Sequence, residues 1–192
     1  MRIAVLGWGS LVWDPKTLVE HLVGADLGAW ATDGPLLPVE FARASDEGKG
    51  RLSLVIVPSM PLVQVLWNVM QTQNLDVAIR ELRHRERTST KKIGYINLIT
   101  GNFECQHGQP IIELIQKWVK AKEVFDAVIW TDLESNFSEV QKRELSETTA
   151  VAYVQSLTGD TYIEAKNYIL KAPAQVQTMF RPALERALLV DV

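Results

Sequence analysis

The sequence has few of the side chains that form disulfides or bind metals. It contains one cysteine, Cys105, and three histidines in 192 residues. A single cysteine excludes a disulfide within the chain, and the few imidazoles form no recognisable structural zinc motif. We therefore expect a protein of a reducing compartment, the cytoplasm, whose functional site holds no metal.

Long apolar runs and a strong charge of one sign are also missing. No apolar run approaches the roughly 20 residues that a membrane-spanning helix needs, and the N-terminus lacks the basic and apolar regions of a signal peptide. The net charge of −3 gives no electrostatic basis for binding nucleic acid or an anionic membrane. The expected partner is a small molecule, and the sequence carries no signal of oligomeric state.

What the sequence does contain is typical of a globular domain. Hydrophobic residues make up 47% of the chain and charged residues 22%, which suffices for a core without disulfides or metal at this length. No repeat, low-complexity tract or linker divides the chain. We expect a single domain over residues 1–192, with the site in a core of residues 1–135 and a helical C-terminal extension, residues 136–192, packed on it as a cap.

Hydrophobic periodicity predicts strands and helices in mixed order, and so an α+β fold. The expected strands cover residues 2–6, 38–44, 52–57, 63–69, 92–100 and 125–130. The expected helices cover residues 16–23, 74–87, 110–122, 138–144, 147–157 and 161–171, with a further helical stretch from residue 174 that is interrupted at Pro182. The expected N-cap residues are Asn74, Ser146 and Asp160. The short connection Pro58-Ser59-Met60-Pro61 predicts that strands 52–57 and 63–69 form an antiparallel hairpin.

A glycine-rich loop after the first predicted strand is the first candidate site. Its residues are Gly7, Trp8, Gly9, Ser10 and Leu11. Glycines permit backbone angles that other residues avoid, and consecutive N–H groups in such a turn converge on an anion or a polarised carbonyl. The loop lacks the third glycine of a dinucleotide-binding motif and the Gly-Lys-Ser of a phosphate-binding loop. The alternative is a loop that only connects a strand to the next element.

Glu86, near the end of a predicted helix, is the second candidate. On a helical wheel it falls on the apolar stripe formed by Leu75, Ile79 and Leu82, whereas Arg85 points away from that stripe. A carboxylate that faces a core is costly unless it is paired, hydrogen-bonded or protonated. We interpret Glu86 as functional; the alternative is a frayed helix end at which it bends outward and pairs with an arginine.

Three further polar groups have mainly structural interpretations. Cys105 and His107 are close in sequence, but no feature of the segment activates a nucleophile. Asp132 follows a buried strand, where an aspartate contacts a ligand or caps the next turn, and we favour the cap. His84 has no partner at metal-binding spacing and is interpreted as a surface residue.

The loop and the helical glutamate together resemble the γ-glutamylcyclotransferase superfamily. That family has a Tyr-Gly-Ser-Leu or Tyr-Gly-Ser-Asn loop after its first strand, often followed by Trp-x-Pro, and a catalytic glutamate shortly after a later helix. The corresponding residues here are Gly7-Trp8-Gly9-Ser10-Leu11, Trp13-Asp14-Pro15 and Arg85-Glu86, with Trp8 in place of the family tyrosine. The match covers about the first half of the chain.

The resemblance implies a small, mostly antiparallel β-barrel with flanking helices and an active-site cavity. It implies a lyase or acyltransferase of glutathione metabolism that needs no cofactor and releases 5-oxoproline from a γ-glutamyl amide or peptide. The substrate's own α-amine attacks its γ-carbonyl, with Glu86 as general base and then acid, its pKa raised by desolvation on the apolar stripe. The loop residues would bind the substrate and stabilise the oxyanion, and Tyr95 is the candidate for a family tyrosine that follows the glutamate.

Two other functions stay open for the same fold. One is a non-catalytic module that binds a small metabolite or a protein. The other is an amidase, in which water attacks the γ-carbonyl and free glutamate is the product.

Overall fold

The structure, a computed structural model, describes residues 1–24, 30–45 and 50–189. The chain divides into two compact units, the first of residues 1–37 and 64–133 and the second of residues 38–63 and 134–192. The strands predicted over residues 38–57, expected in the core of residues 1–135, belong to the same unit as the C-terminal helices. The single domain with a C-terminal cap stays a prediction.

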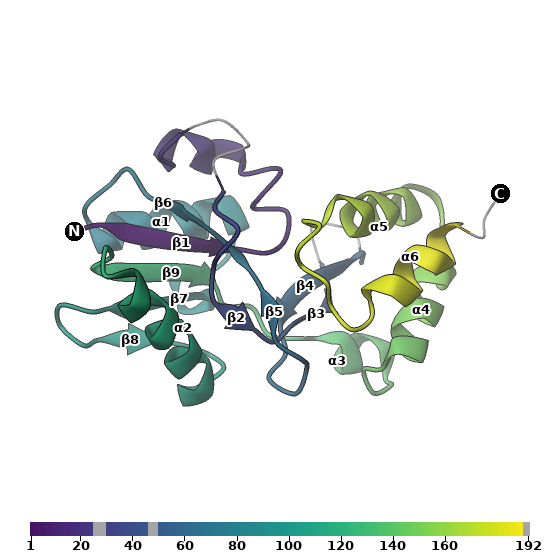
Figure 1. The fold of residues 1–192 in the computed structure, drawn as a ribbon. Coiled ribbons are helices and arrows are strands. Elements are labelled where there is room, and N and C mark those ends of the chain that lie inside the picture. Colours follow the sequence, from purple (N-terminus) through teal and green to yellow (C-terminus); the bar gives the residue numbers. More distant parts are fainter. Residues whose placement is uncertain (25–29, 46–49, 190–192) are drawn as a thin grey trace. The chain divides into compact units, whose positions relative to one another are not determined.

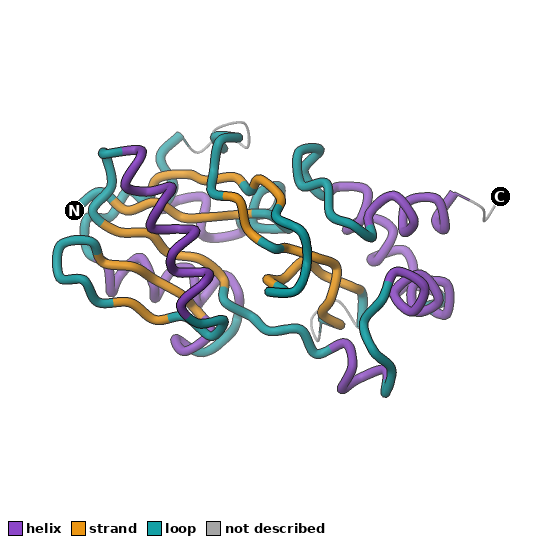
Figure 2. Tube along the Cα trace, turned by 60° about the horizontal axis from the view of Figure 1, so that its bottom comes forward, coloured by secondary structure: helices purple, strands orange, loops and turns teal. Residues whose placement is uncertain are grey.

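An open five-stranded sheet forms the centre of the first unit (Figures 1 and 2). In spatial order its strands are β6 (Leu66–Val69), β1 (Ile3–Gly7), β9 (Ala127–Thr131), β7 (Ile93–Asn97) and β8 (Phe103–Glu104). Strand β1 is parallel to β9, and all other neighbours are antiparallel. All of β1 and all of β9 except Thr131 are buried, as expected for uninterrupted apolar strands that are covered on both faces.

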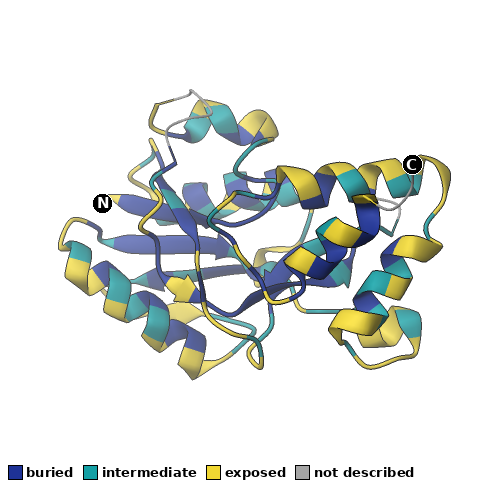
Figure 3. Ribbon diagram, turned by 45° about the vertical axis from the view of Figure 1, so that its right-hand side comes forward, coloured by how far each residue is buried: buried dark blue, intermediate teal, exposed yellow. Residues whose placement is uncertain are grey.

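Two helices cover the two faces of this sheet. Helix α1 (Leu75–Glu86) lies behind the sheet in Figure 1 and packs on β9 and β7, and α2 (Gln109–Lys122) lies in front of it. Trp67 of β6 contacts Trp118 of α2, with 6.0 Å between the ring centroids. The buried strands between the helices are dark blue in Figure 3. The helix predicted over residues 74–87 is confirmed with its cap, because the Asn74 side chain accepts a hydrogen bond from the Val77 N–H at 3.2 Å.

The shorter elements of the first unit connect these parts. They are the 3-10 helices η1 (Lys16–His21) and η2 (Thr90–Lys92) and the strand β2 (Leu36–Leu37). Strand β5 (Val63–Gln64) spans the point at which the chain passes from one unit to the other. The helix predicted over residues 16–23 is thus a single stretch of 3-10 helix.

The mixed α+β class is confirmed, but no sheet closes into a barrel within the described residues. At one end of the large sheet β8 pairs with β7, and at the other end β6 pairs with β1 and, through Trp67, forms an isolated bridge with Ala31. No pairing joins β6 to β8 among the described residues. Strands β3 (Val39–Ala44) and β4 (Leu52–Ile56), which a barrel would have used, pair with each other instead. The predicted small β-barrel is therefore not present in this part of the chain.

The predicted hairpin of residues 52–57 with 63–69 is wrong. Strand β4 pairs with β3, and the pairing continues past β4, where the Val57 N–H donates to the Pro38 carbonyl at 2.7 Å. Strand β6 pairs with β1. Prolines at positions 58 and 61 lack the N–H groups that a ladder beside a tight turn needs, so the segment between them serves as a connection rather than as a hairpin turn.

The second unit combines the β3–β4 pair with four helices. These are α3 (Phe137–Gln141), α4 (Glu147–Ser156), α5 (Gly159–Lys171) and α6 (Arg181–Leu189). Helix α4 begins with a capping box, in which the Ser146 side chain accepts from the Thr149 N–H and the Thr149 side chain accepts from the Ser146 N–H. The helical character predicted after residue 138 is confirmed.

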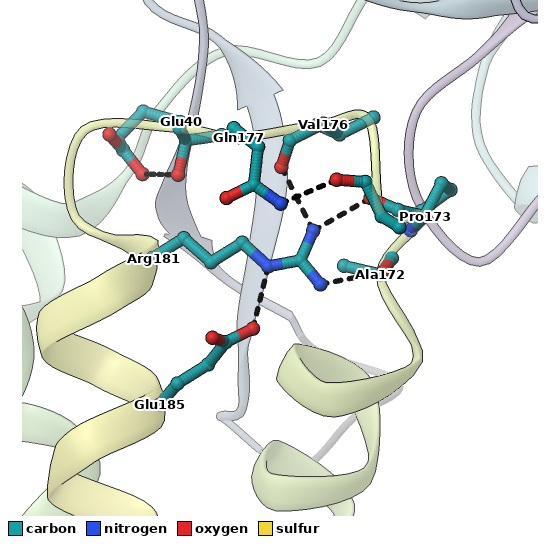
Figure 4. A network of polar contacts seen from close by, with 9 residues as sticks. Glu40, Ala172, Pro173, Val176, Gln177, Arg181 and Glu185 are labelled. Atoms are coloured by element: carbon teal, nitrogen blue, oxygen red, sulfur yellow. Dashed lines mark hydrogen bonds and ion pairs between the residues drawn. The ribbon is translucent and has the colours of Figure 1, made fainter.

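Two buried charged side chains fix the segment before α6 (Figure 4). Arg181 donates to the carbonyls of Pro173, Ala172 and Val176 at 2.7, 2.8 and 3.0 Å and pairs with Glu185 at 2.7 Å. Glu40 of β3 accepts from the Thr178 hydroxyl at 2.6 Å and from the Phe180 N–H at 3.0 Å. Burial raises the pKa of Glu40, and these hydrogen bonds oppose that rise. Both groups are satisfied internally, so we interpret this network as structural.

Candidate functional site

The glycine-rich loop leaves β1 as two consecutive tight turns. The Val12 N–H donates to the Gly9 carbonyl at 2.9 Å, and the Asp14 N–H donates to the Ser10 carbonyl at 2.8 Å. Trp8 and Leu11 are each 5% exposed. The side chains of the loop thus anchor it in the first unit, while its backbone forms the turn.

Gly7 is required here for space. A Cβ atom on Gly7 would lie 2.7 Å from Cζ3 of Trp30 and 3.1 Å from Cγ2 of Val12. Gly7 does not have a positive φ, so the reason expected from the sequence, an unusual backbone angle, does not apply to it. The close approach of the Trp30 ring explains the glycine instead.

The backbone N–H groups of the loop are the feature most relevant to ligand binding. Within the part of the chain that the structure describes, the N–H groups of Gly9, Ser10 and Leu11 donate no hydrogen bond. Consecutive N–H groups without an internal acceptor are the donors that bind anions and developing oxyanions. The loop therefore has three adjacent N–H donors that no described residue uses, in a segment where Gly9 and Leu11 are buried.

Arg85 connects this loop to the end of helix α1. Its Nη2 donates to the Ser10 Oγ at 3.1 Å and to the Asp14 carbonyl at 2.6 Å. Its Nη1 donates to Oε1 of Glu86 at 2.7 Å. The Arg85 side chain is 5% exposed, and that of Glu86 is 14% exposed. The two candidates from the sequence, the loop and Glu86, thus bind the same guanidinium group.

The environment of Glu86 differs from the expected one. The buried face of α1 consists of Ala78, Leu82 and Arg85, and Glu86 lies at its side. The helical wheel was wrong for Arg85, which was expected to point away from the core. The helical wheel placed the centre of the buried face of α1 too close to Leu75 and Ile79. These two residues are only partly buried, whereas Leu82 is fully buried. Glu86 is paired with a cation, as in the alternative interpretation, but its side chain is mostly buried, and the guanidinium that binds it also binds the loop.

Tyr95 lies on the face of the sheet that α1 covers. Strand register aligns Tyr95 with Ile129, Ile129 with Val5 and Val5 with Asn68. That row lies on the face opposite Trp67, whose ring contacts α2. Among the described residues, no hydrogen bond joins Tyr95 to Ser10 or to Glu86. The structure places Tyr95 on the face that α1 covers but does not link it to Ser10 or Glu86, so its role stays a prediction.

Asp132 organises the turn that contains Cys105. It is fully buried and accepts hydrogen bonds from the Trp130 indole N–H, at 3.0 Å, and from the Gln106 N–H. Burial, with the nearby negative charge of Asp132, raises the pKa of the Cys105 thiol to about 11. A thiol with such a pKa is protonated at neutral pH and is a poor nucleophile. The structural interpretation of Cys105 with His107 is therefore supported. Asp132 is also structural, but within the described residues it does not cap the turn that follows β9, which was the expected role; it holds the earlier turn at Gln106.

The remaining polar residues offer no metal centre. His84 is half exposed and lies 3.9 Å from Glu81, in agreement with a surface position. No group of three or more His, Cys, Asp or Glu side chains suited to a metal ion occurs in residues 1–24, 30–45 and 50–189. Over the same residues, no helix has the length and apolar character needed to cross a membrane.

The burial of Arg85 and its contacts with the loop were not predicted from the sequence. Arg85 was considered only as the neighbour of Glu86, because no signal in the helix itself shows that its side chain turns inward.

Comparison of the chain with protein-family models, with curated proteins and with solved structures found no match.

Proposed function

We propose that this chain is a γ-glutamylcyclotransferase-like enzyme, which releases 5-oxoproline from a γ-glutamyl amide or peptide. The observation that carries the proposal is the shared guanidinium of Arg85, which binds both Ser10 of the loop and Glu86. A carboxylate and a set of backbone donors at one place are what an intramolecular acyl transfer requires. The resemblance of the two motifs to that superfamily gives the substrate class.

In the proposed reaction, the neutral α-amine of the γ-glutamyl group attacks its own γ-carbonyl carbon. The new C–N bond closes the five-membered ring, and Glu86 takes the proton that the amine loses. The carbonyl oxygen becomes an oxyanion and is stabilised by N–H groups of Gly9, Ser10 and Leu11, each good donor contributing roughly 3 kcal/mol. Glu86 then returns the proton to the leaving amine as the old C–N bond breaks, so no cofactor or water is consumed.

The geometry of Glu86 supports this role. Its Oε1 is bound by Arg85, while its Oε2 has no hydrogen-bond partner among the described residues. The second oxygen is therefore free to accept a proton from a substrate amine. The indole of Trp8, in place of the family tyrosine, would contribute an apolar wall beside the glutamyl chain.

A panel of γ-glutamyl compounds, covering peptides, amino acids and amines, tests the proposal. Each is incubated with the purified protein, and 5-oxoproline is measured by mass spectrometry. The Glu86→Gln variant is expected to lose the activity, while Glu81→Gln, on the same helix but outside the loop network, retains it. Free glutamate as the product would favour the amidase. Binding of a compound without turnover would favour the non-catalytic module, and 5-oxoproline release by Glu86→Gln would refute the role of Glu86.

A further inference from the structure

We propose that Arg85 is a positioning residue, which holds the catalytic carboxylate and the binding loop in a fixed relation. This inference rests on the proposed function, because it assigns a role to Arg85 in that reaction. Arg85 acts through Glu86 and Ser10 and need not touch the substrate. Four observations support it.

The first observation is the geometry of the guanidinium. Its two terminal nitrogens bind different partners. Nη1 donates to Glu86, and Nη2 donates to Ser10 and Asp14 of the loop segment. A planar guanidinium carries these donors at fixed angles, whereas a lysine ammonium offers one point charge at the end of a flexible chain. Arg85 thus sets the direction of the Glu86 carboxylate relative to the loop in a way that lysine does not reproduce.

The second observation is that this ion pair joins adjacent helix positions. Side chains at i and i+1 on a helix diverge, and favourable helix pairs are three or four residues apart. The contact of 2.7 Å between Arg85 and Glu86 therefore requires both side chains to turn toward each other. Arg80 and Glu81 form a similar adjacent pair at 3.0 Å on the same helix, but the Arg85 guanidinium differs from that of Arg80 because it is buried and also binds the loop.

The third observation concerns the two oxygens of Glu86. The ion pair occupies Oε1 and leaves Oε2 without a protein partner in the described residues. A carboxylate held by one oxygen presents the other in a defined direction, which is the arrangement that a general base needs. Without Arg85, the carboxylate would rotate among several directions.

The fourth observation is that the guanidinium of Arg85 uses only its terminal nitrogens. Its Nε atom is buried and has no hydrogen-bond partner among the described residues. The Nε atoms of Arg51 and Arg83 share this feature, so the unpaired Nε does not by itself distinguish Arg85. What distinguishes it is that both terminal nitrogens are directed to the loop and to Glu86.

The test compares Arg85→Lys and Arg85→Ala with Arg80→Lys, a control at an exposed position of the same helix. On a substrate that the wild type turns over, Arg85→Lys is expected to lower kcat about 100-fold, because a misplacement of about 1 Å at a reacting group has that effect. Its KM should change less than threefold. Guanidinium ions should restore part of the activity of Arg85→Ala and none of Glu86→Gln. Arg80→Lys should match the wild type.

The kinetic results for Arg85→Lys either support or overturn the positioning role of Arg85. Full kcat in Arg85→Lys, or a loss confined to KM, would overturn the positioning role. If Arg85→Ala does not fold, Arg85→Lys alone carries this test. If the wild type turns over no γ-glutamyl compound, the proposed function fails, and hydrogen exchange then tests Arg85 separately. Faster exchange of the Val12 and Asp14 N–H groups in Arg85→Lys would support the link to the loop, and unchanged exchange would refute it.

Discussion

Replacement of Gly94 by alanine should destabilise the first unit severely. A Cβ atom at this position would lie 2.1 Å from Cε2 and 2.4 Å from Nε1 of Trp130, distances at which atoms cannot coexist. Gly94 and Trp130 are direct partners on β7 and β9, and Trp130 is fully buried. The indole must therefore move, or the two central strands must separate.

Movement of the indole has a second cost. Its N–H donates to Asp132 at 3.0 Å, and Asp132 also holds the turn at Gln106. Overpacking of a core costs about 1–3 kcal/mol, and a lost hydrogen bond to a charged group costs about 1.5–3 kcal/mol. Since both apply, we expect Gly94→Ala to lower the free energy of unfolding by about 4 kcal/mol.

Urea denaturation followed by circular dichroism measures this change. Gly101→Ala is the control, because a Cβ atom at this position meets nothing within 4 Å and the φ of +78° is the only source of strain. We expect this variant to lower the free energy of unfolding by about 1–2 kcal/mol. Trp130→Leu should make the Gly94→Ala change less costly, since the ring is then absent. A loss below about 1 kcal/mol for Gly94→Ala, within the range of an ordinary surface substitution, would refute the reasoning.

Two further predictions concern buried titratable groups. The Cys105 thiol has a pKa of about 11, against 9.0 for an exposed thiol. It should therefore react with iodoacetamide at pH 8 about 100-fold more slowly in the folded protein than in urea, and equal rates of reaction would contradict its burial. The Cys105→Ser variant should retain 5-oxoproline release. Burial raises the pKa of Glu40 above 4.5, so the folded state binds the proton of this carboxyl group more tightly than the unfolded state does. The free energy of unfolding of the wild type, compared with that of Glu40→Gln, should therefore fall as the pH rises from 4.5 through the folded-state pKa. A stability difference that does not change with pH, or that changes in the opposite direction, would contradict this assignment.

Local signals in the sequence predicted local structure well. Asn74 and Ser146 cap α1 and α4 as expected, because a capping side chain acts within three residues of its own position. The cap expected at Asp160 is wrong, since Thr158 is the N-cap of α5 and Asp160 lies in its first turn. The loop of Gly7 to Leu11 follows a buried strand as predicted. Arg85 binds both Ser10 of the loop and Glu86, and this link was not predicted from the sequence.

Features that depend on pairing over long distances were not predictable. The partner of β4 is β3, and that of β6 is β1, although a short connection between β4 and β6 favoured a hairpin. Prolines in a short connection restrict the backbone conformation of the turn, but they do not determine which strand pairs with which. Arg85 was missed for a related reason, since its burial depends on acceptors at Ser10 and Asp14, which are more than 70 residues away and carry no signal in the helix itself.

The central claim is that Glu86 transfers a proton within a γ-glutamyl substrate beside the loop of Gly9 to Leu11. The most direct measurement is 5-oxoproline release by the wild type, Glu86→Gln and Glu81→Gln on the same γ-glutamyl panel, with folding of all three checked by circular dichroism. We expect release by the wild type and by Glu81→Gln and a loss of at least about 100-fold in Glu86→Gln, as for a positioned general base. Equal release by all three folded proteins, or none from the wild type on any compound, would contradict it.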